Sequence, residues 1–312
     1  VLGIIASWFL VAKKLRQQTE ELGALTLPRF LELKFRKKDP LLRSVAAGII
    51  TFCFAFYIAA QFDAAGKALS QTFGWPEMSG VLVGASIIVF YTFMGGFLAV
   101  AWTDFIQGWI MLITLVALPL VTLSVLGGWE GLTETIAKET SAGEAALLLN
   151  PTGGRTGWTL LAGILGGVGV GFGYAGQPHL LARYMSIRSV GDITKARSIA
   201  ISWAVLAYGG AVLMGIVALA HFGPNYFTDP ELMMPQLAKE MFPSWFAGIL
   251  ICGALAAMMS TADSQLLVTT SAISEDVYHQ SINPKAKQAD LLKLSRIVTI
   301  ITAVPDILAM LT

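Results

Sequence analysis

Hydroxyl groups and one carboxylate interrupt an apolar stretch near the end of the chain, residues 257–265. If the stretch is helical, four residues fall at positions i, i+3, i+4 and i+7 of one face: Ala257, Ser260, Thr261 and Ser264. Polar side chains inside a membrane are energetically unfavourable, and they therefore mark functional sites. Oxygen atoms are the ligands that small hard cations prefer. The spacing therefore predicts a cation site, with Asp263 beside it; the alternative is that each hydroxyl donates to a carbonyl of its own helix.

A glycine-rich segment, residues 157–177, contains eight glycines. Glycine is unfavourable in a helix by about 1 kcal/mol relative to alanine. Unwound backbone at membrane depth lines a protein cavity, and glycine-interrupted spans mark solute sites. The other interpretation is close helix packing through small residues. Tyr174, an aromatic with a polar tip, favours a solute site.

Asp104 is the only acidic or basic residue between Met78 and Trp129. The segment is long enough for two membrane spans, so we expect a short turn at residues 102–104. Thr103 or Asp104 would then cap the second of the two helices.

The composition excludes an ordinary soluble domain. The chain is 55% hydrophobic and 13% charged, with a mean hydropathy of +0.68, whereas soluble domains are about 25% charged. Five windows lack charged residues and approach or exceed the length of a span, namely 44–62, 105–129, 157–179, 198–225 and 244–262. With the apolar segments 1–12 and 78–103 we expect about seven spans, plus a partial one at 297–312.

Basic residues alternate between loops and predict the orientation. Three loops, 13–43, 178–197 and 274–296, hold 17 of the 21 Lys and Arg residues. By the positive-inside rule these loops face the cytoplasm. The basic residues lie in short juxtamembrane loops rather than on one domain face, which argues against nucleic-acid binding.

The sequence shows no catalytic constellation: no nucleophile with a base, no phosphate loop and no Cys/His cluster. Its two cysteines, Cys53 and Cys252, lie within predicted spans and indicate neither a disulfide framework nor a metal site. We therefore expect no enzyme and no metal other than a bound alkali cation. Because residues 1–12 are too short to cross a bilayer, we expect the chain to be an interior piece of a longer membrane protein.

Four segments in order resemble the sodium/solute symporter family, and most closely its sodium/proline symporters. They are residues 24–28 (ALTLP), 91–104 (YTFMGGFLAVAWTD), 173–183 (GYAGQPHLLAR) and 256–261 (AAMMST) followed by SEDVY at 274–278.

The resemblance implies an all-α polytopic membrane protein with a partial LeuT-like bundle of two inverted five-helix repeats. Residues 1–312 would form a single membrane domain that is incomplete at both ends. Residues 1–129 would supply helices 2–5 of the first repeat. Residues 157–312 would supply helices 1–3 and the start of helix 4 of the second.

The resemblance also implies site residues. A sodium ion would be held by the Ala257 carbonyl and the Ser260 and Thr261 hydroxyls, with the missing first helix supplying further ligands. Asp104 matches an aspartate implicated in sodium access, to which we add Asp263 and Ser264 as candidates. The implied solute-binding residues are Tyr57, Tyr174, Gln177 and Pro178.

The implied function is sodium-coupled symport of a small organic solute by alternating access, in the cell (inner) membrane. Proline is the first candidate, although Val170 stands where those proline symporters carry tryptophan, so another small solute remains open. A different class is also open: a membrane sensor in which the same bundle is fused to a signalling domain. An ion channel is less favoured, because no repeated filter segment is visible. The expected partners are the solute, the sodium ion and the lipid bilayer.

Overall fold

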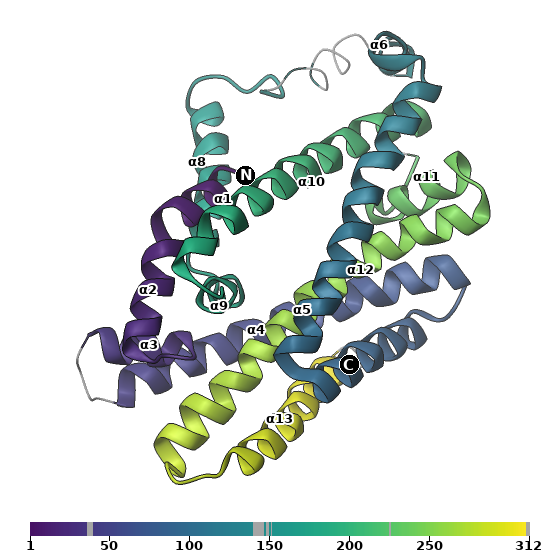
Figure 1. The fold of residues 1–312 in the computed structure, drawn as a ribbon. Coiled ribbons are helices and arrows are strands. Elements are labelled where there is room, and N and C mark those ends of the chain that lie inside the picture. The colour runs from purple at the N-terminus through teal and green to yellow at the C-terminus, as the bar shows by residue number, and fades with distance from the viewer. Residues whose placement is uncertain (36–39, 140–146, 148–149, 151, 225, 310–312) are drawn as a thin grey trace. The chain divides into compact units, whose positions relative to one another are not determined.

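The computed structural model describes residues 1–35, 40–139, 147, 150, 152–224 and 226–309 (Figure 1). Within these residues every regular element is a helix, as predicted. Residues 36–39 of the predicted basic loop 13–43 lie outside the described part, as do ten residues between 140 and 151.

Five helices are long and apolar enough to cross a membrane, namely 40–70, 77–125, 157–174, 190–222 and 244–282. The remaining predicted segments are also helical. Residues 2–22 run through α1 (Leu2–Ser7), the π-helical η1 (Trp8–Ala12) and α2 (Lys13–Leu22). Residues 297–309 of the partial segment lie in α13 (Gln288–Ala309), which extends further toward the N-terminus than predicted, and residues 310–312 lie outside the described part.

The long helix α5 (Glu77–Val125) is two helices joined at Gly96, whose φ of 55° and ψ of −144° are not helical. Glycine adopts such a backbone readily because it lacks a Cβ. The turn predicted at residues 102–104 is therefore wrong, because the chain is helical there and the break lies at Gly96. The predicted cap is wrong as well, since the Thr103 hydroxyl donates to the Ala99 carbonyl at 3.0 Å.

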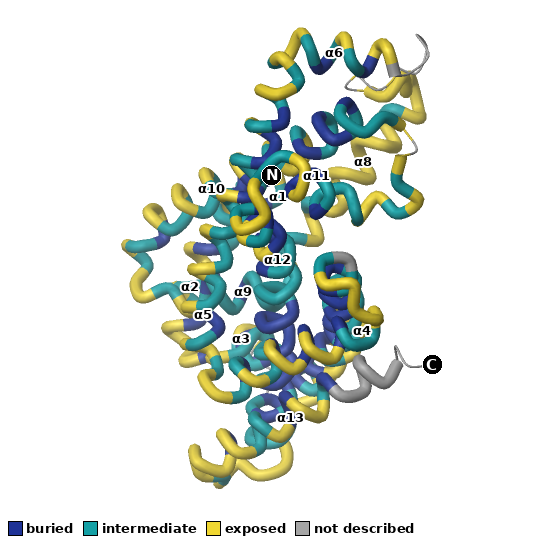
Figure 2. Tube along the Cα trace, turned by 90° about the vertical axis from the view of Figure 1, so that its right-hand side faces the viewer, coloured by how far each residue is buried: buried dark blue, intermediate teal, exposed yellow. Residues whose placement is uncertain are grey.

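The glycine-rich segment is more regular than predicted. Residues 157–174 form the α-helix α8 (Gly157–Tyr174), and the break follows it at residues 175–177. Gly171 makes a close backbone contact with Gly3 of α1. A Cβ on Gly3 would not fit, because it would clash with the Gly171 carbonyl oxygen. No residue of α8 is buried, as its exposed colouring in Figure 2 shows. The expectation of unwound backbone inside the glycine run is therefore wrong. The contact between Gly171 and Gly3 is of the kind that close helix packing through small residues predicts.

The structure divides into two compact units. The first comprises residues 1–5, 108–174 and 198–254. Its complete helices are α6 (Gly128–Glu139), α8 and α11 (Met233–Met241), with the 3-10 turn η3 (Pro230–Leu232), and it holds most of α10 (Ile193–Phe222). Leu118, Leu132, Val217, Leu237 and Leu250 form the centre of its buried core.

The second unit comprises residues 6–107, 175–197 and 255–312. It contains η1, α2, α13 and five further elements: α3 (Leu27–Lys34), α4 (Pro40–Phe73), α9 (Pro178–Met185), η2 (Val190–Asp192) and the π-helical η4 (Ala272–Ile282). The C-terminal half of α12 (Ser244–Ser271) runs directly into η4. In this unit α4 packs against α3, η4 and α13 (Figure 1). Helix α4 has both buried and exposed positions along its length, as Figure 2 shows, which is typical of a helix with one protein-facing side.

The helices α4 and α5 approach closely at Gly66 and Gly80. A Cβ on Gly80 would lie 2.5 Å from the Gly66 carbonyl oxygen, and a Cβ on Gly66 would lie 3.0 Å from the Val81 nitrogen. The Cβ on Gly66 would also clash with Val81 Cγ2, and the backbone obstacles at both positions cannot move aside as a flexible side chain can. The two glycines are thus required by packing.

Gly66→Leu is expected to lower the free energy of unfolding by about 1–3 kcal/mol, because it overpacks this contact. Gly48→Leu on the same helix is the control, since no atom lies within 4 Å of its position for a Cβ. That change should leave stability equal or up to about 1 kcal/mol higher, through better helix propensity. Denaturation of the purified variants in micelles measures both values, and equal stability of the two variants would contradict the packing argument.

Candidate functional site

The hydroxyl stripe on α12 gathers two hydroxyl oxygens around one backbone carbonyl. The Ala257 carbonyl accepts hydrogen bonds from Ser260 Oγ at 3.2 Å and from Thr261 Oγ1 at 2.9 Å. Both hydroxyls are half-buried. The bonding of hydroxyls to their own helix, one of the two sequence interpretations, is therefore present in the structure.

This geometry is also compatible with a cation. Each hydroxyl keeps lone pairs, and rotating an O–H bond away from the carbonyl moves no heavy atom. Three oxygens from Ala257, Ser260 and Thr261 could then face one ion. They form part of a coordination shell, because a hard cation takes about six oxygens or more.

One turn further along α12, the two predicted access carboxylates meet around Ser264. The Ser264 hydroxyl lies 3.4 Å from Asp104 Oδ2 and 3.3 Å from Asp263 Oδ1. Its single proton can serve only one of them at a time. The structure therefore brings together the three residues that were predicted as sodium access.

Two further side chains complete this acidic cluster. The guanidinium of Arg183, on α9, forms an ion pair with Asp104 and donates to Ser264 Oγ at 2.7 Å. It also lies over the ring of Phe97, 5.4 Å from the ring centroid. The Tyr91 hydroxyl donates to Asp263 Oδ2 at 2.6 Å. Asp263 itself is completely buried.

The charges of the cluster do not balance when both carboxylates are ionised. Asp104 and Asp263 then contribute two negative charges, and Arg183 contributes one positive charge. Uncompensated charge is unfavourable away from water. A proton or a cation would neutralise the remaining charge, and Asp104 Oδ1 is buried with no hydrogen-bond partner among the described residues.

Sequence reasoning missed Arg183 and Tyr91 as members of the cluster. From the sequence, Arg183 was considered only as one of the basic residues of the loop 178–197. Tyr91 was considered only as part of the family-like segment 91–104. The available signal was their position inside two of the four family-like segments. Their partners lie 79 and 172 residues away along the chain, so no local pattern pairs them.

The predicted solute-binding residues are distributed over both units. Tyr174 ends α8 in the first unit, whereas Tyr57, Gln177 and Pro178 belong to the second. Tyr57 is exposed, and Gln177 precedes α9, whose first residue is Pro178. The solute role of these four residues stays a prediction.

His179 follows in α9 and packs edge-on against Phe54, with ring centroids 5.6 Å apart. Burial and, to a smaller extent, the positive charge of Arg183 together lower the pKa of His179 to about 4. The imidazole is therefore neutral near neutral pH.

The fold and its polar clusters define a multi-pass α-helical membrane protein. A solved structure of a sodium-coupled sialic acid symporter, in a substrate-bound outward-open state, shares this fold with a TM-score of 0.78. The match covers 98% of this chain and 67% of that one at 18% identity. The chain belongs to the sodium:solute symporter family, whose model matches residues 1–312.

Curated relatives agree with this assignment. A high-affinity proline transporter of Bacillus subtilis is 37% identical over 306 residues, which are 97% of this chain and 63% of the relative. The sodium/proline symporters of Salmonella typhimurium and Escherichia coli are each 36% identical over 309 residues, again 97% of this chain and 60% of each relative. The chain thus spans about three fifths of the length of these relatives. The predicted family and all-helical fold are confirmed, as is the prediction of a transport family rather than an enzyme.

Proposed function

We propose that the full-length protein couples the entry of sodium to the uptake of a small organic solute, with proline as the first candidate. The relatives named as proline transporters support this solute. The observation that carries the proposal is the convergence of Ser260 and Thr261 on the Ala257 carbonyl. In the proposed mechanism sodium binds these three oxygens, stabilises the solute-binding state and is released with the solute by alternating access.

Two further residue sets belong to the proposal. The cluster of Asp104, Asp263 and Ser264 would attract sodium toward the stripe on α12, because it carries excess negative charge when both carboxylates are ionised. Tyr57, Tyr174, Gln177 and Pro178 would contact the solute. Both assignments rest on the resemblance of the four sequence segments to this family.

The same proposal includes the organisation of the chain in the cell membrane. Residues 1–129 and 157–312 would belong to two inverted repeats. The loops 13–43, 178–197 and 274–296 would face the cytoplasm, as the distribution of basic residues indicates.

Uptake of labelled proline into vesicles that contain the full-length protein tests the proposal. We expect uptake to require an inward sodium gradient and to vanish when potassium replaces sodium. Sodium-independent proline uptake would refute the coupling. If labelled proline is not transported, sodium-driven uptake of other labelled small solutes would identify a different substrate.

Thr261→Ala is expected to raise the sodium concentration for half-maximal uptake by about 10–100-fold. Losing the contact between the Thr261 hydroxyl and the ion should weaken sodium binding by about 1.5–3 kcal/mol, the range for one polar bond to a charged group. A difference of about 1.4 kcal/mol corresponds to a tenfold change in affinity. Ser260→Ala should act in the same direction.

Thr122→Ala is the matched control for these variants. Thr122 is a buried threonine on α5 whose hydroxyl donates to the Leu118 carbonyl at 2.9 Å, as Thr261 does to Ala257. Its removal deletes the same kind of intrahelical bond outside the proposed site. A sodium requirement that changes equally in all three variants would remove Ser260 and Thr261 from the site.

A further inference from the structure

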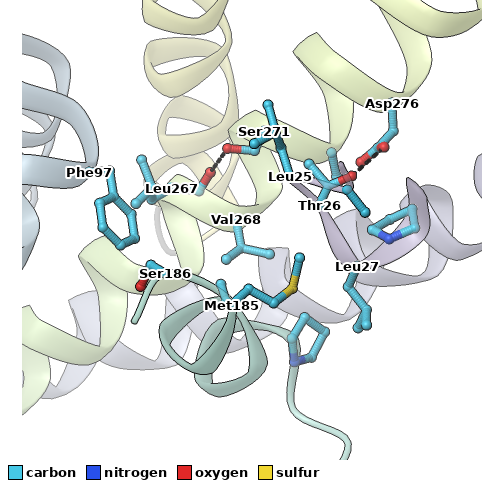
Figure 3. A pocket seen from close by; sticks show the side chains of 15 residues that line it. Leu25, Thr26, Leu27, Phe97, Met185, Ser186, Leu267, Val268, Ser271 and Asp276 are labelled. Atoms are coloured by element: carbon cyan, nitrogen blue, oxygen red, sulfur yellow. Dashed lines mark hydrogen bonds between the residues drawn. The ribbon is translucent and has the colours of Figure 1, made fainter. Parts of the chain in front are cut away.

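A cavity of about 380 Å³ lies within the second unit, apart from the stripe on α12 and the acidic cluster. The loop before α3, helix α9 and the junction of α12 with η4 enclose it (Figure 3). Most of its wall is apolar and includes Leu25, Leu27, Phe97, Met185, Leu267 and Val268. Cavities of this size hold small organic molecules.

One buried carboxylate lines this apolar cavity. Asp276, on η4, is completely buried, and its Oδ1 accepts a hydrogen bond from Thr26 Oγ1 at 2.6 Å (Figure 3). Its Oδ2 is also buried and has no hydrogen-bond partner among the described residues. A buried acceptor that lacks a donor destabilises the fold by about 1–3 kcal/mol, and more when it is charged. A ligand that supplies a donor would remove this penalty.

The neighbouring basic groups do not supply that donor. Arg43 donates to the backbone carbonyl of Asp276 rather than to its carboxylate, and it pairs with Glu32. Arg29 pairs with the same Glu32 carboxylate. Neither arginine lines the cavity, and in the part of the chain that the structure describes no lysine, arginine or histidine does so.

Asp276 also sits in an unusual backbone. Residues 272–282 are π-helical, directly after the α-helical part of α12. π-helical turns occur frequently at functional sites. This feature agrees with a binding role for the segment.

We propose that this cavity binds a small, mainly apolar amine whose ammonium group donates to Asp276 Oδ2. The apolar wall would hold the body of the molecule, with Phe97 and Met185 suited to an aromatic ring. A carboxylate on the ligand would find no positively charged side chain in the wall. The site therefore prefers an amine over an amino acid or an organic acid.

Such a ligand would contact the loop before α3, α9 and η4 at once. It would stabilise whichever conformation of the protein contains this cavity, because a ligand shifts a population toward the state that it binds better. Pro178, one of the proposed solute contacts, also lines the cavity, so binding is tested in the absence of proline and without transport.

Titration calorimetry of the purified full-length protein with benzylamine, in sodium-free and proline-free buffer near neutral pH, tests the proposal. Benzyl alcohol and benzoate are the neutral and anionic counterparts of the same size. We expect saturable binding of benzylamine that is at least about tenfold tighter than that of either counterpart, the factor that corresponds to 1.4 kcal/mol. Absence of saturable benzylamine binding, or equal binding of benzoate, would overturn the proposal.

Asp276→Asn is expected to weaken benzylamine binding by at least about tenfold, because the amide cannot pair with the ammonium. Glu275→Gln is the matched control: the neighbouring carboxylate accepts from His279 and Gln280 and does not line the cavity. It should change binding by less than about twofold. Unchanged binding by Asp276→Asn would overturn the proposal.

A second variant gives an answer if Asp276→Asn does not fold. Ala182 of α9 lines the cavity, and Ala182→Phe would fill it while leaving Asp276 in place. We expect this variant to lose benzylamine binding. Retained binding in a folded Ala182→Phe protein would place the ligand elsewhere and overturn the proposal.

Discussion

Arg43→Met is expected to lower the free energy of unfolding by about 3–5 kcal/mol, the loss typical of removing one partner from a buried ion pair. The Arg43 side chain is 3% exposed. Its Nη1 donates to Glu32 Oε2 at 2.6 Å, its Nε to the Asp276 carbonyl at 3.0 Å and its Nη2 to Ser281 Oγ at 2.9 Å. One guanidinium thus joins α3, α4 and η4. Unfolding of the purified protein in mixed micelles measures the loss.

The double variant Glu32→Gln with Arg43→Met separates charge burial from packing. If the loss comes from leaving the buried Glu32 carboxylate with the partly exposed Arg29 in place of two arginine partners, neutralising Glu32 should recover about half of the loss or more. Arg43→Lys should fall between wild type and Arg43→Met, because an ammonium lacks the fork that reaches three partners.

The control is Lys138→Met. Lys138 faces Glu134 at 3.8 Å on α6, and both side chains are exposed. Exposed ion pairs contribute about 0–1 kcal/mol, so this variant should match wild type closely. If Lys138→Met and Arg43→Met lowered the free energy of unfolding equally, the buried network would contribute no more to stability than an exposed ion pair.

Arg183→Gln is expected to reduce solute uptake by about 100-fold, which corresponds to about 2.8 kcal/mol. Among the described residues, its guanidinium is the positive group that acts on the carboxylates of Asp104 and Asp263, and it also donates a hydrogen bond to Ser264. Without it the cluster carries two uncompensated negative charges when both acids are ionised. Such a cluster would rearrange, or hold a cation too tightly to release it. Initial rates of sodium-driven uptake measure the effect.

The double variant Arg183→Gln with Asp104→Asn restores the net charge of the wild-type cluster. We expect its uptake rate to be at least about tenfold higher than that of Arg183→Gln alone, because mutations of directly interacting groups are not additive. Failure of the double variant to recover any uptake would show that Arg183 acts by some means other than charge balance.

Arg197→Gln is the control for the loss of an arginine in the same unit. The Arg197 guanidinium lies over the ring of Phe9, 4.0 Å from its centroid. A cation–π contact is worth about 0.5–1 kcal/mol at exposed sites, so uptake should stay within about fivefold of wild type. A similar loss of uptake in Arg197→Gln and Arg183→Gln would contradict a specific role of Arg183 in the acidic cluster.

Much of this fold was predictable because the signals for it are local. A window without charges that is long enough to cross a bilayer must satisfy its backbone groups internally, and a helix does so. The windows 44–62 and 244–262 accordingly lie within α4 and α12, and residues 198–222 of the window 198–225 lie within α10. The stripe on α12 was equally local, because the helical period places Ser260 and Thr261 beside the Ala257 carbonyl.

The position of the break in α5 was not predictable by the same means. Asp104 and Thr103 looked like capping residues, but they lie inside a continuous helix. The left-handed backbone falls at Gly96, where it has no steric penalty. Conversely, the glycine run of α8 stays helical, because its intrahelical hydrogen bonds outweigh the modest propensity penalty of each glycine.

By itself, the sequence determined the class of protein, the helical segments and the three oxygens on α12, since hydrophobic length and helical period act over a few residues. Only the tertiary structure decided which polar groups meet. Asp104 pairs with Arg183, Tyr91 donates to Asp263 and Arg43 reaches Asp276, across separations of 79, 172 and 233 residues. The physical reason is that a buried polar group takes its partner from whichever helix packs beside it. That neighbour is set by the packing of whole helices and not by any short stretch of sequence.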